Sequence, residues 1–329
     1  MRVLRTLFDN FTLALLALLA VMLAATVLPC EGYGAVFFET LTSLAIGLLF
    51  FLHGARLSPQ NVRSGAGHWR LHALVFFCTF VMFPLIGLAL KPIVSPLVGR
   101  ELYVGLLYLC ALPATVQSAI AFTSLARGNV PAAICSAAAS SLLGIFLTPL
   151  LVYLLVGVEG ADVGLHAVLK IVLQLLAPFV LGQLARRWIA GWVEKRRGWL
   201  RFVDQGSILL VVYTAFSEAT VFGLWHSVPM QKLALLGVVC CALLALVLWL
   251  TQALAKRFGF NVEDRITILF AGSKKSMATG VPMAQILFSG GAVGAVILPL
   301  MLFHQIQLMV CALLAQRYAR RGDVDPVEA

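Results

Sequence analysis

The sequence predicts an all-α polytopic membrane protein with about ten transmembrane helices. Of its 329 residues, 61% are hydrophobic and 12% are charged, whereas a soluble domain is about 25% charged. The mean hydropathy is +0.98. Long apolar runs recur along the whole chain with short polar connections between them, which excludes a soluble enzyme on a single anchor.

A helix that crosses the hydrocarbon core needs about 20 residues, and the apolar runs divide accordingly. The fourth and ninth runs are the least regular, because Pro113 with polar neighbours interrupts one, and two lysines, Gly280 and Pro282 interrupt the other. The expected spans are 11–29, 40–56, 71–90, 101–127, 130–155, 164–185, 207–223, 234–255, 266–288 and 293–316.

The basic residues predict the orientation of these spans, since Lys and Arg favour cytoplasmic loops. With both termini cytoplasmic, eighteen of the 24 basic residues fall inside and only Lys91, Arg100 and Lys232 outside. Pro29-Cys30-Glu31 is a poor signal-peptide cleavage site, so the first run should be a retained helix. We expect a bacterial inner-membrane protein. The net charge of +10 comes from basic residues in short loops beside the anionic surface of the lipid bilayer. We therefore expect no binding of nucleic acid.

Lys274 and Lys275 are adjacent within the ninth apolar run. One Lys at a bilayer centre costs about 2.5 to 3.5 kcal/mol even on lenient scales, so this pair should face a polar cavity, a counter-charge or a bound solute. On a helix the two side chains point about 100 degrees apart, and both reach one ligand only if the backbone is unwound. Alternatively, carbonyl groups of broken helices cap both lysines.

The cysteines and histidines predict no metal centre and no cofactor. The seven cysteines are scattered and form no spaced CxxC pair, which is typical of packing thiols. Among the six histidines only His304, beside Gln305 and Gln307, lies deep in a span. It either lines a transport pathway or has a hydrogen-bonded packing role.

The irregular fourth and ninth spans predict two five-helix inverted repeats, residues 1–160 and 161–329. In such transporters discontinuous helices meet near the midplane and offer free backbone groups to a solute or ion. The two interruptions are Leu112-Pro113-Ala114-Thr115-Val116-Gln117-Ser118 and Ala271-Gly272-Ser273-Lys274-Lys275-Ser276. Simple Pro and Gly kinks are the alternative.

Several segments resemble the bile acid:sodium symporter family, solute carrier family 10. Ala126-Arg127-Gly128-Asn129-Val130, continuing to Ser140-Ser141-Leu142-Leu143, resembles the junction of its fourth and fifth helices. Gly272-Ser273-Lys274-Lys275-Ser276 with Val281-Pro282-Met283 resembles the ninth helix of the divergent seventh member and of related bacterial sodium-dependent transporters. The resemblance covers nearly the whole chain.

The resemblance implies a panel of helices 1, 2, 6 and 7 and a core of helices 3–5 and 8–10, in which broken helices 4 and 9 cross. It also implies ion or substrate contacts from helices 3, 4, 5 and 9. Carried onto this chain, these are Thr79, Gln117, Ser118, Ser136, Ser140, Ser141, Ser273 and Ser276 beside the two lysines.

The ion site departs from that of the sodium-coupled members in two ways. Phe270 stands where they have a glutamate, and Lys274 stands where they have an ion-binding glutamine; a helix 3 glutamine aligns with Thr79. Sodium prefers several oxygen ligands with a carboxylate among them. We therefore expect the Lys274 ammonium to occupy the space of one sodium ion, with a proton as the alternative coupled ion.

Glu218 is the carboxylate that the sequence places clearly inside a span. It is either a panel-side partner of a lysine or a proton acceptor, or else it is solvated near the outer interface.

The residues favour a secondary transporter of a small organic, anionic solute, coupled to sodium or to protons. A regulatory membrane protein without net transport is second, because the sodium ligands are altered. An intramembrane enzyme is third, since the sequence has neither an HExxH motif nor a pair of in-span aspartates. No pattern specifies the solute or the oligomeric state.

Overall fold

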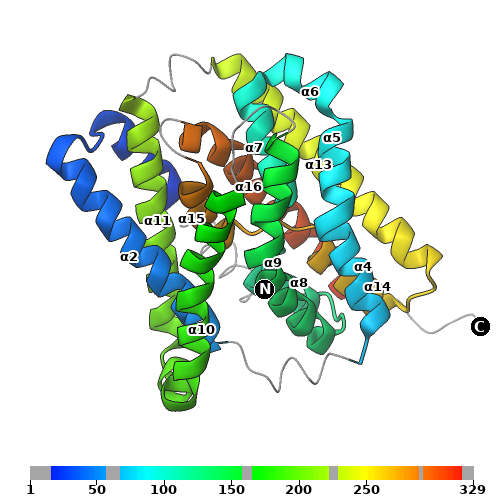
Figure 1. Cartoon of the computed structure of the whole chain (residues 1–329). Coiled ribbons are helices and arrows are strands. Elements are labelled where there is room, and N and C mark those ends of the chain that lie inside the picture. Colours follow the sequence, from blue (N-terminus) through cyan, green and yellow to red (C-terminus); the bar gives the residue numbers. More distant parts are fainter. Residues whose placement is uncertain (1–15, 57–66, 158–164, 222–228, 289–291, 321–329) are drawn as a thin grey trace, which may run out of the picture. The chain divides into compact units, whose positions relative to one another are not determined.

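The computed structural model describes residues 16–56, 67–157, 165–221, 229–288 and 292–320, and regular structure in these ranges is helical (Figure 1). A first apolar helix covers Leu16–Val27. The further helices are α2 Gly32–Arg56, α4 Trp69–Phe77, η1 Cys78–Met82 (a π-helix), α5 Phe83–Ala89, α6 Lys91–Val98, α7 Arg100–Ala111, α8 Gln117–Leu125, α9 Val130–Gly157, α10 Leu165–Lys195, α11 Arg197–Val221, α13 Met230–Arg257, α14 Val262–Gly272, α15 Met277–Leu287 and α16 Ala292–Ala319.

The all-α polytopic fold class is confirmed. Within the described residues, five helices are long and apolar enough to cross a membrane: Gly32–Arg56, Trp69–Ala89, Val130–Val156, Met230–Arg257 and Ala292–Ala319. Each overlaps an expected span. The fourth and ninth expected spans are each divided into two helices, α7 with α8 and α14 with α15.

Some expected boundaries were wrong, because hydropathy locates the part of a helix that lies in hydrocarbon and not the end of its hydrogen-bond ladder. Helix α2 begins at Gly32 instead of residue 40. Helix α10 continues to Lys195 instead of 185, and α11 begins at Arg197 instead of 207. The basic residues that were assigned to a loop there therefore lie on two helices joined at Arg196. The short helix α6 was not expected.

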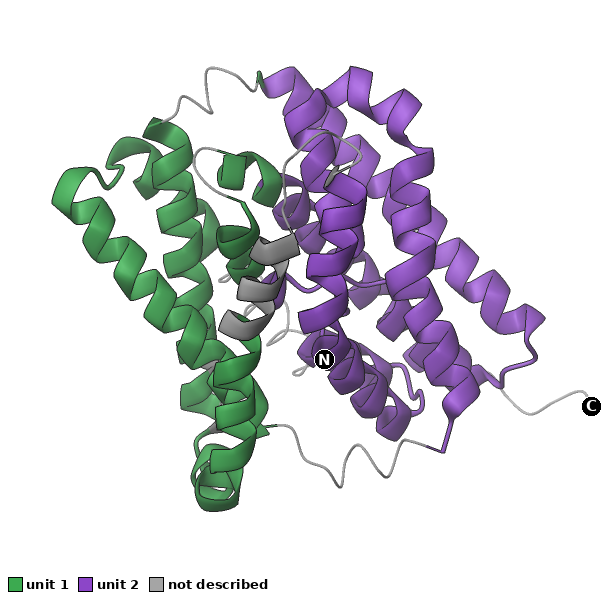
Figure 2. Cartoon of the chain, viewed as in Figure 1, with its two compact units in different colours: residues 1–56, 173–229, 281–297 green, residues 57–172, 230–280, 298–329 purple. Residues whose placement is uncertain are grey.

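The chain divides into two compact units (Figure 2). Unit 1 comprises residues 1–56, 173–229 and 281–297, and unit 2 comprises residues 57–172, 230–280 and 298–329. The division into repeats 1–160 and 161–329, and that into panel and core helices, stay predictions.

In unit 1, α2 packs closely against α10 and α11. The Thr42 and Thr214 hydroxyls share a hydrogen bond of 2.8 Å between α2 and α11, and Arg56 forms an ion pair with Asp204. Between α2 and α10 two glycines allow the backbones to touch: Gly54 lies against the carbonyl of Phe179, and Gly182 lies against that of Phe51. Small residues commonly permit such contacts between membrane helices.

Replacing either glycine of this contact should destabilise the protein. In Gly54→Ala and Gly182→Ala the added methyl overlaps a backbone carbonyl, and overpacking of this kind costs about 1–3 kcal/mol. The measurement is the thermal unfolding midpoint of purified protein in detergent. Matched controls on the same helices are Gly47→Ala and Gly191→Ala, where a Cβ meets nothing within 4 Å. Equal midpoints for all four variants would contradict the close contact.

Candidate functional site

Two interrupted helices meet inside unit 2. The α7–α8 segment loses helical structure at residues 112–116, and the α14–α15 segment loses it at 273–276. The Ser276 amide donates to the Pro113 carbonyl at 2.9 Å, which joins the two breaks directly. Both interruptions are therefore true breaks and not simple kinks.

The Lys275 ammonium is held by three backbone carbonyls from two other helical segments. Its Nζ donates to the oxygens of Thr79 at 2.7 Å, Cys110 at 2.8 Å and Leu112 at 2.7 Å. It also lies 4.2 Å from the centroid of the Phe83 ring. Lysine has three donors, so these contacts use all of them, and the side chain is fully buried.

Local chain geometry explains why the Thr79 carbonyl is free to accept. In an α-helix it would accept from the Phe83 amide, but the π-turn of η1 directs that amide to the Cys78 carbonyl. The next residue, Pro84, has no N–H to offer. A π-turn followed by proline thus leaves one buried carbonyl unpaired, and Lys275 satisfies it.

The carbonyls at the end of α7 need outside donors for a different reason. The last turn of a helix has no intrahelical partners for its C=O groups, and its partial negative charge favours a cation. The Cys110 carbonyl accepts from Lys275, and that of Ala111 accepts from the Thr148 hydroxyl at 2.9 Å. The Ala114 amide beyond the break donates to Ser140 Oγ at 3.0 Å.

A glutamine fixes the backbone of Lys275. Gln307 Oε1 accepts from the Lys275 amide at 2.9 Å, and its Nε2 donates to the Lys275 carbonyl at 2.8 Å. The same amide group is 2.9 Å from His304 Nδ1. His304, which was expected either on a pathway or in packing, therefore belongs to the shell that positions the break in α14–α15.

Lys274 has a different environment from Lys275, although it is also fully buried. Its Nζ donates one long hydrogen bond, 3.3 Å, to Ser118 Oγ. It lies 4.3 Å from the Phe122 ring centroid and 5.6 Å from that of Phe270. Those rings belong to an apolar cluster with Ile266 and Cys311. The Lys274 ammonium thus retains donor capacity that the described residues do not use.

The expectation that the Lys274 ammonium occupies the space of a sodium ion stays a prediction, and the structure adds Lys275 as a second candidate for that role. The sequence alignment with sodium-coupled transporters pointed to Lys274 as the ammonium in an ion-like position. In the structure the ammonium surrounded by oxygens is that of Lys275, because backbone carbonyls that no sequence alignment reveals converge on it.

The structure brings several of the predicted hydroxyl groups to the breaks. Ser118 donates to Thr115 Oγ1 at 2.8 Å while accepting from Lys274. The Ser276 Oγ accepts from the Thr279 amide at the start of α15, and Ser273 Oγ donates to the Leu269 carbonyl. These groups either contact a lysine or end a helix segment.

The side chains of the remaining predicted residues make other contacts. Thr79 contributes its carbonyl, while its hydroxyl donates to Val75 O within its own helix. Ser136 pairs with His72 Nδ1 at 2.7 Å. Gln117 is exposed and Ser141 is half-buried. Glu218 is half-buried on α11 in unit 1, so its proposed pairing with a lysine stays a prediction.

A second contact joins the chain just after α8 to the first turns of α14. Asn129, just before α9, donates from Nδ2 to Asp264 Oδ1 at 2.8 Å, and its amide donates to Thr267 Oγ1 at 3.0 Å. Asn261 caps α14 by accepting from the Asp264 amide. Asn129 belongs to the segment that resembles the junction of the family's fourth and fifth helices, and its side chain anchors α14.

Sequence reasoning missed Gln307 and Asp264. Gln307 carried one usable signal, an amide in the middle of an apolar span one turn after His304. Asp264 lies just outside the apolar run, so hydropathy assigns it to a connection. Asn261, three residues earlier, is an N-cap residue type and is the signal by which Asp264 could have been assigned to a helix.

Comparison with known proteins identifies the family. A model of the SBF-like CPA transporter family matches residues 9–320. The chain belongs to this family. It is 68% identical to an uncharacterized protein of Pseudomonas aeruginosa over 97% of this chain and 95% of that protein.

Two further relatives of this SBF-like chain carry functional names. The proposed symporter YfeH of Escherichia coli K12 is 56% identical over 96% of this chain and 94% of its own length. Sodium/bile acid cotransporter 7 of Danio rerio is 29% identical over 84% of this chain and 83% of its own length. The resemblance to the bile acid:sodium symporter family is confirmed, and the SBF-like chain is a multi-pass membrane transporter.

Removal of the Lys275 ammonium should destabilise the protein more than removal of that of Lys274. Lys275→Met leaves three buried carbonyls without a donor, and each unpaired buried acceptor costs about 1–3 kcal/mol. Lys274→Met loses a single long hydrogen bond. Thermal unfolding in detergent compares the two variants. A smaller loss for Lys275→Met than for Lys274→Met would contradict the structural role of Lys275.

The Gln307 amide can be tested against its neighbour. Gln307→Leu removes both hydrogen bonds to the Lys275 backbone and should lower the unfolding free energy by about 1–3 kcal/mol. Gln305→Leu on the same helix is the control, because Gln305 is only half-buried and its side chain forms no hydrogen bond with the described residues. Equal unfolding midpoints for Gln307→Leu and Gln305→Leu would contradict the role of Gln307.

Proposed function

We propose that this protein is a secondary transporter that moves a small organic anion by alternating access, with Lys275 as a built-in cation in place of a recruited sodium ion. The observation that carries the proposal is the set of three carbonyl oxygens around the Lys275 ammonium at the meeting point of two broken helices. Discontinuous helices of this kind commonly form the solute and ion sites of transporters.

The contacts of Lys275 support its role as a built-in cation. Carbonyl oxygens are ligands for monovalent cations as well as for ammonium groups, and here the cation is covalently attached. Its charge is met by carbonyl dipoles and by the Phe83 ring, and no carboxylate of the described residues forms an ion pair with it. A sodium ion beside it would meet like charge, which disfavours sodium coupling at this position.

The contacts of Lys274 support a role in binding the solute. A buried ammonium with one weak hydrogen bond gains the most from an anion that offers oxygen acceptors. The adjacent Phe122 and Phe270 rings would favour a solute whose anionic group is attached to an apolar body. We infer a carboxylate or sulfate on a hydrophobic skeleton, with an inner-membrane location and both termini in the cytoplasm.

Uptake into proteoliposomes tests this function. Purified protein is reconstituted, and uptake of a panel of sterol and carboxylate solutes is followed under imposed sodium or proton gradients. We expect uptake of at least one anionic solute without sodium, with a proton gradient as the alternative driving force. Absence of flux under every gradient would contradict transport, and an absolute requirement for sodium would contradict the replacement of sodium by Lys275.

Variants then separate binding from coupling. Lys274→Gln removes the charge that binds the anion and should reduce uptake at least tenfold, about 1.4 kcal/mol of lost interaction. Lys256→Gln removes an exposed charge at the end of α13 and should leave uptake unchanged. Equal uptake by Lys274→Gln and wild type would remove Lys274 from the binding site.

A further inference from the structure

A tip rich in tryptophan and basic residues joins α10 and α11 in unit 1. Trp188, Trp192, Trp199 and Phe202 have exposed fractions of 68%, 47%, 57% and 72%. Six basic residues lie in the same stretch: Arg186, Arg187, Lys195, Arg196, Arg197 and Arg201. Tryptophan beside Lys and Arg is typical of helix ends at a membrane–water interface.

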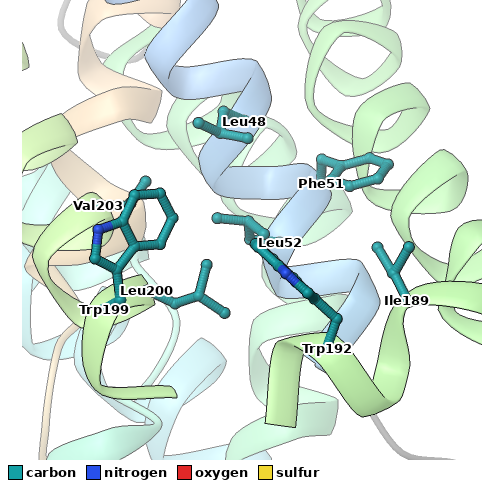
Figure 3. Close-up of a pocket in the computed structure, with 8 residues that line it drawn as sticks. All are labelled: Leu48, Phe51, Leu52, Ile189, Trp192, Trp199, Leu200 and Val203. Carbon is teal, nitrogen blue, oxygen red and sulfur yellow. The ribbon is translucent and has the colours of Figure 1, made fainter. Parts of the chain in front are cut away.

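An apolar groove opens between this tip and α2. It has a volume of about 430 Å³, and eight apolar residues from α2, α10 and α11 line it (Figure 3). Leu52 and Leu200 at its base belong to a buried cluster with Ala55 and Val193. The lining residues are Leu48, Phe51, Leu52, Ile189, Trp192, Trp199, Leu200 and Val203.

The lining of the groove contains no charged residue, and one cationic group, that of Arg196, lies beside it. The Arg196 guanidinium is 5.8 Å from the Trp192 ring centroid, and the two indoles of Trp192 and Trp199 meet edge to face at 6.5 Å. Arg187, Lys195 and Arg196 are exposed. Arg56 donates to Asp204 and to the Leu200 carbonyl, and its ion pair with Asp204 leaves it without a free charge for a ligand.

We propose that this groove binds an anionic phospholipid of the surrounding membrane. One acyl chain occupies the apolar groove, and the phosphate lies against Arg196, which lies over the ring of the lining residue Trp192, and against the adjacent Lys195. The charge of these two residues matches an anionic headgroup, and juxtamembrane basic clusters commonly bind such lipids. A peptide or polar solute fits poorly, because its polar groups would find no partner among the eight apolar lining residues.

A second copy of this chain is a less suitable occupant than a lipid. A symmetric contact through this face would bring the exposed Lys195 and Arg196 of each copy close to those of the other, and like charges oppose association. The groove residues all belong to unit 1, whereas Lys274, Lys275 and their partners belong to unit 2. The lipid site thus shares no residue with the proposed transport site and does not depend on the proposed function.

Native mass spectrometry of the full chain tests the headgroup. Detergent-solubilised protein receives equal amounts of phosphatidylglycerol and phosphatidylcholine with the same acyl chains. Wild type should retain one phosphatidylglycerol preferentially. The double variant Lys195→Gln, Arg196→Gln should lose about tenfold to thirtyfold in affinity for phosphatidylglycerol with little change for phosphatidylcholine. Lys256→Gln with Arg257→Gln removes two exposed charges from the end of α13 and should bind as wild type does.

The acyl-chain part has its own variants. Leu48→Trp places an indole in the groove and should reduce retention of both lipids, whereas Leu44→Trp, on an exposed position one turn away on α2, should not. Trp192→Ala should weaken retention and the exposed Trp249→Ala on α13 should not. Equal retention of the two lipids by wild type, or lipid binding by the double charge variant equal to that of its control, would overturn the proposal. The charge variants alter exposed side chains only, so their folding is not in question.

Discussion

The meeting point of α7–α8 and α14–α15 depends on the Lys275 ammonium. A chain that interrupts two helices within a bilayer must find partners for every N–H and C=O that the interruptions release. Three carbonyls from η1, α7 and the segment after α7 turn toward one point, and a single ammonium satisfies all three. The three hydrogen bonds offset the cost of burying that charge, and lysine supplies all three donors from one atom.

The rest of the crossing follows from the same requirement. Ser276 pairs its amide with Pro113, and Gln307 pairs with both backbone groups of Lys275. Ser140 and Thr148 on α9 complete the break in α7–α8 from the other side. Gly144 on α9 leaves room for the Pro113 ring, since a Cβ there would lie 2.6 Å from Pro113 Cβ. These contacts join the two interruptions into one hydrogen-bonded network within unit 2.

The sequence predicts the approximate spans, the two breaks and the presence of the two lysines at one of them, because each of these depends on hydropathy or on a local helix breaker; the functional role of the lysines stays a prediction. It does not predict which atoms meet. The Thr79 carbonyl is free to accept because the Phe83 amide, in the π-turn, donates to the Cys78 carbonyl instead. Pro84 is the one feature of the sequence that indicates an unpaired carbonyl at this place. Gln307 bonds the backbone of Lys275, 32 positions away, and the periodicity of a helix does not predict a contact between residues so far apart in the chain. Helix ends beyond the hydrocarbon, as at Lys195, lack a hydropathy signal altogether.

The unwound backbone at residues 273–276 gives two adjacent lysines different tasks. Instead of pointing about 100 degrees apart on one helix face, Lys275 reaches back to Thr79, Cys110 and Leu112, and Lys274 reaches to Ser118 and two aromatic rings. The first charge is fully engaged by protein oxygens. The second is held beside it with one long hydrogen bond, and like charges at adjacent residues repel. Under the proposed function, an anion at Lys274 would relieve that repulsion and supply acceptors for its ammonium, so the fixed cation at Lys275 would itself favour an anionic solute at its neighbour.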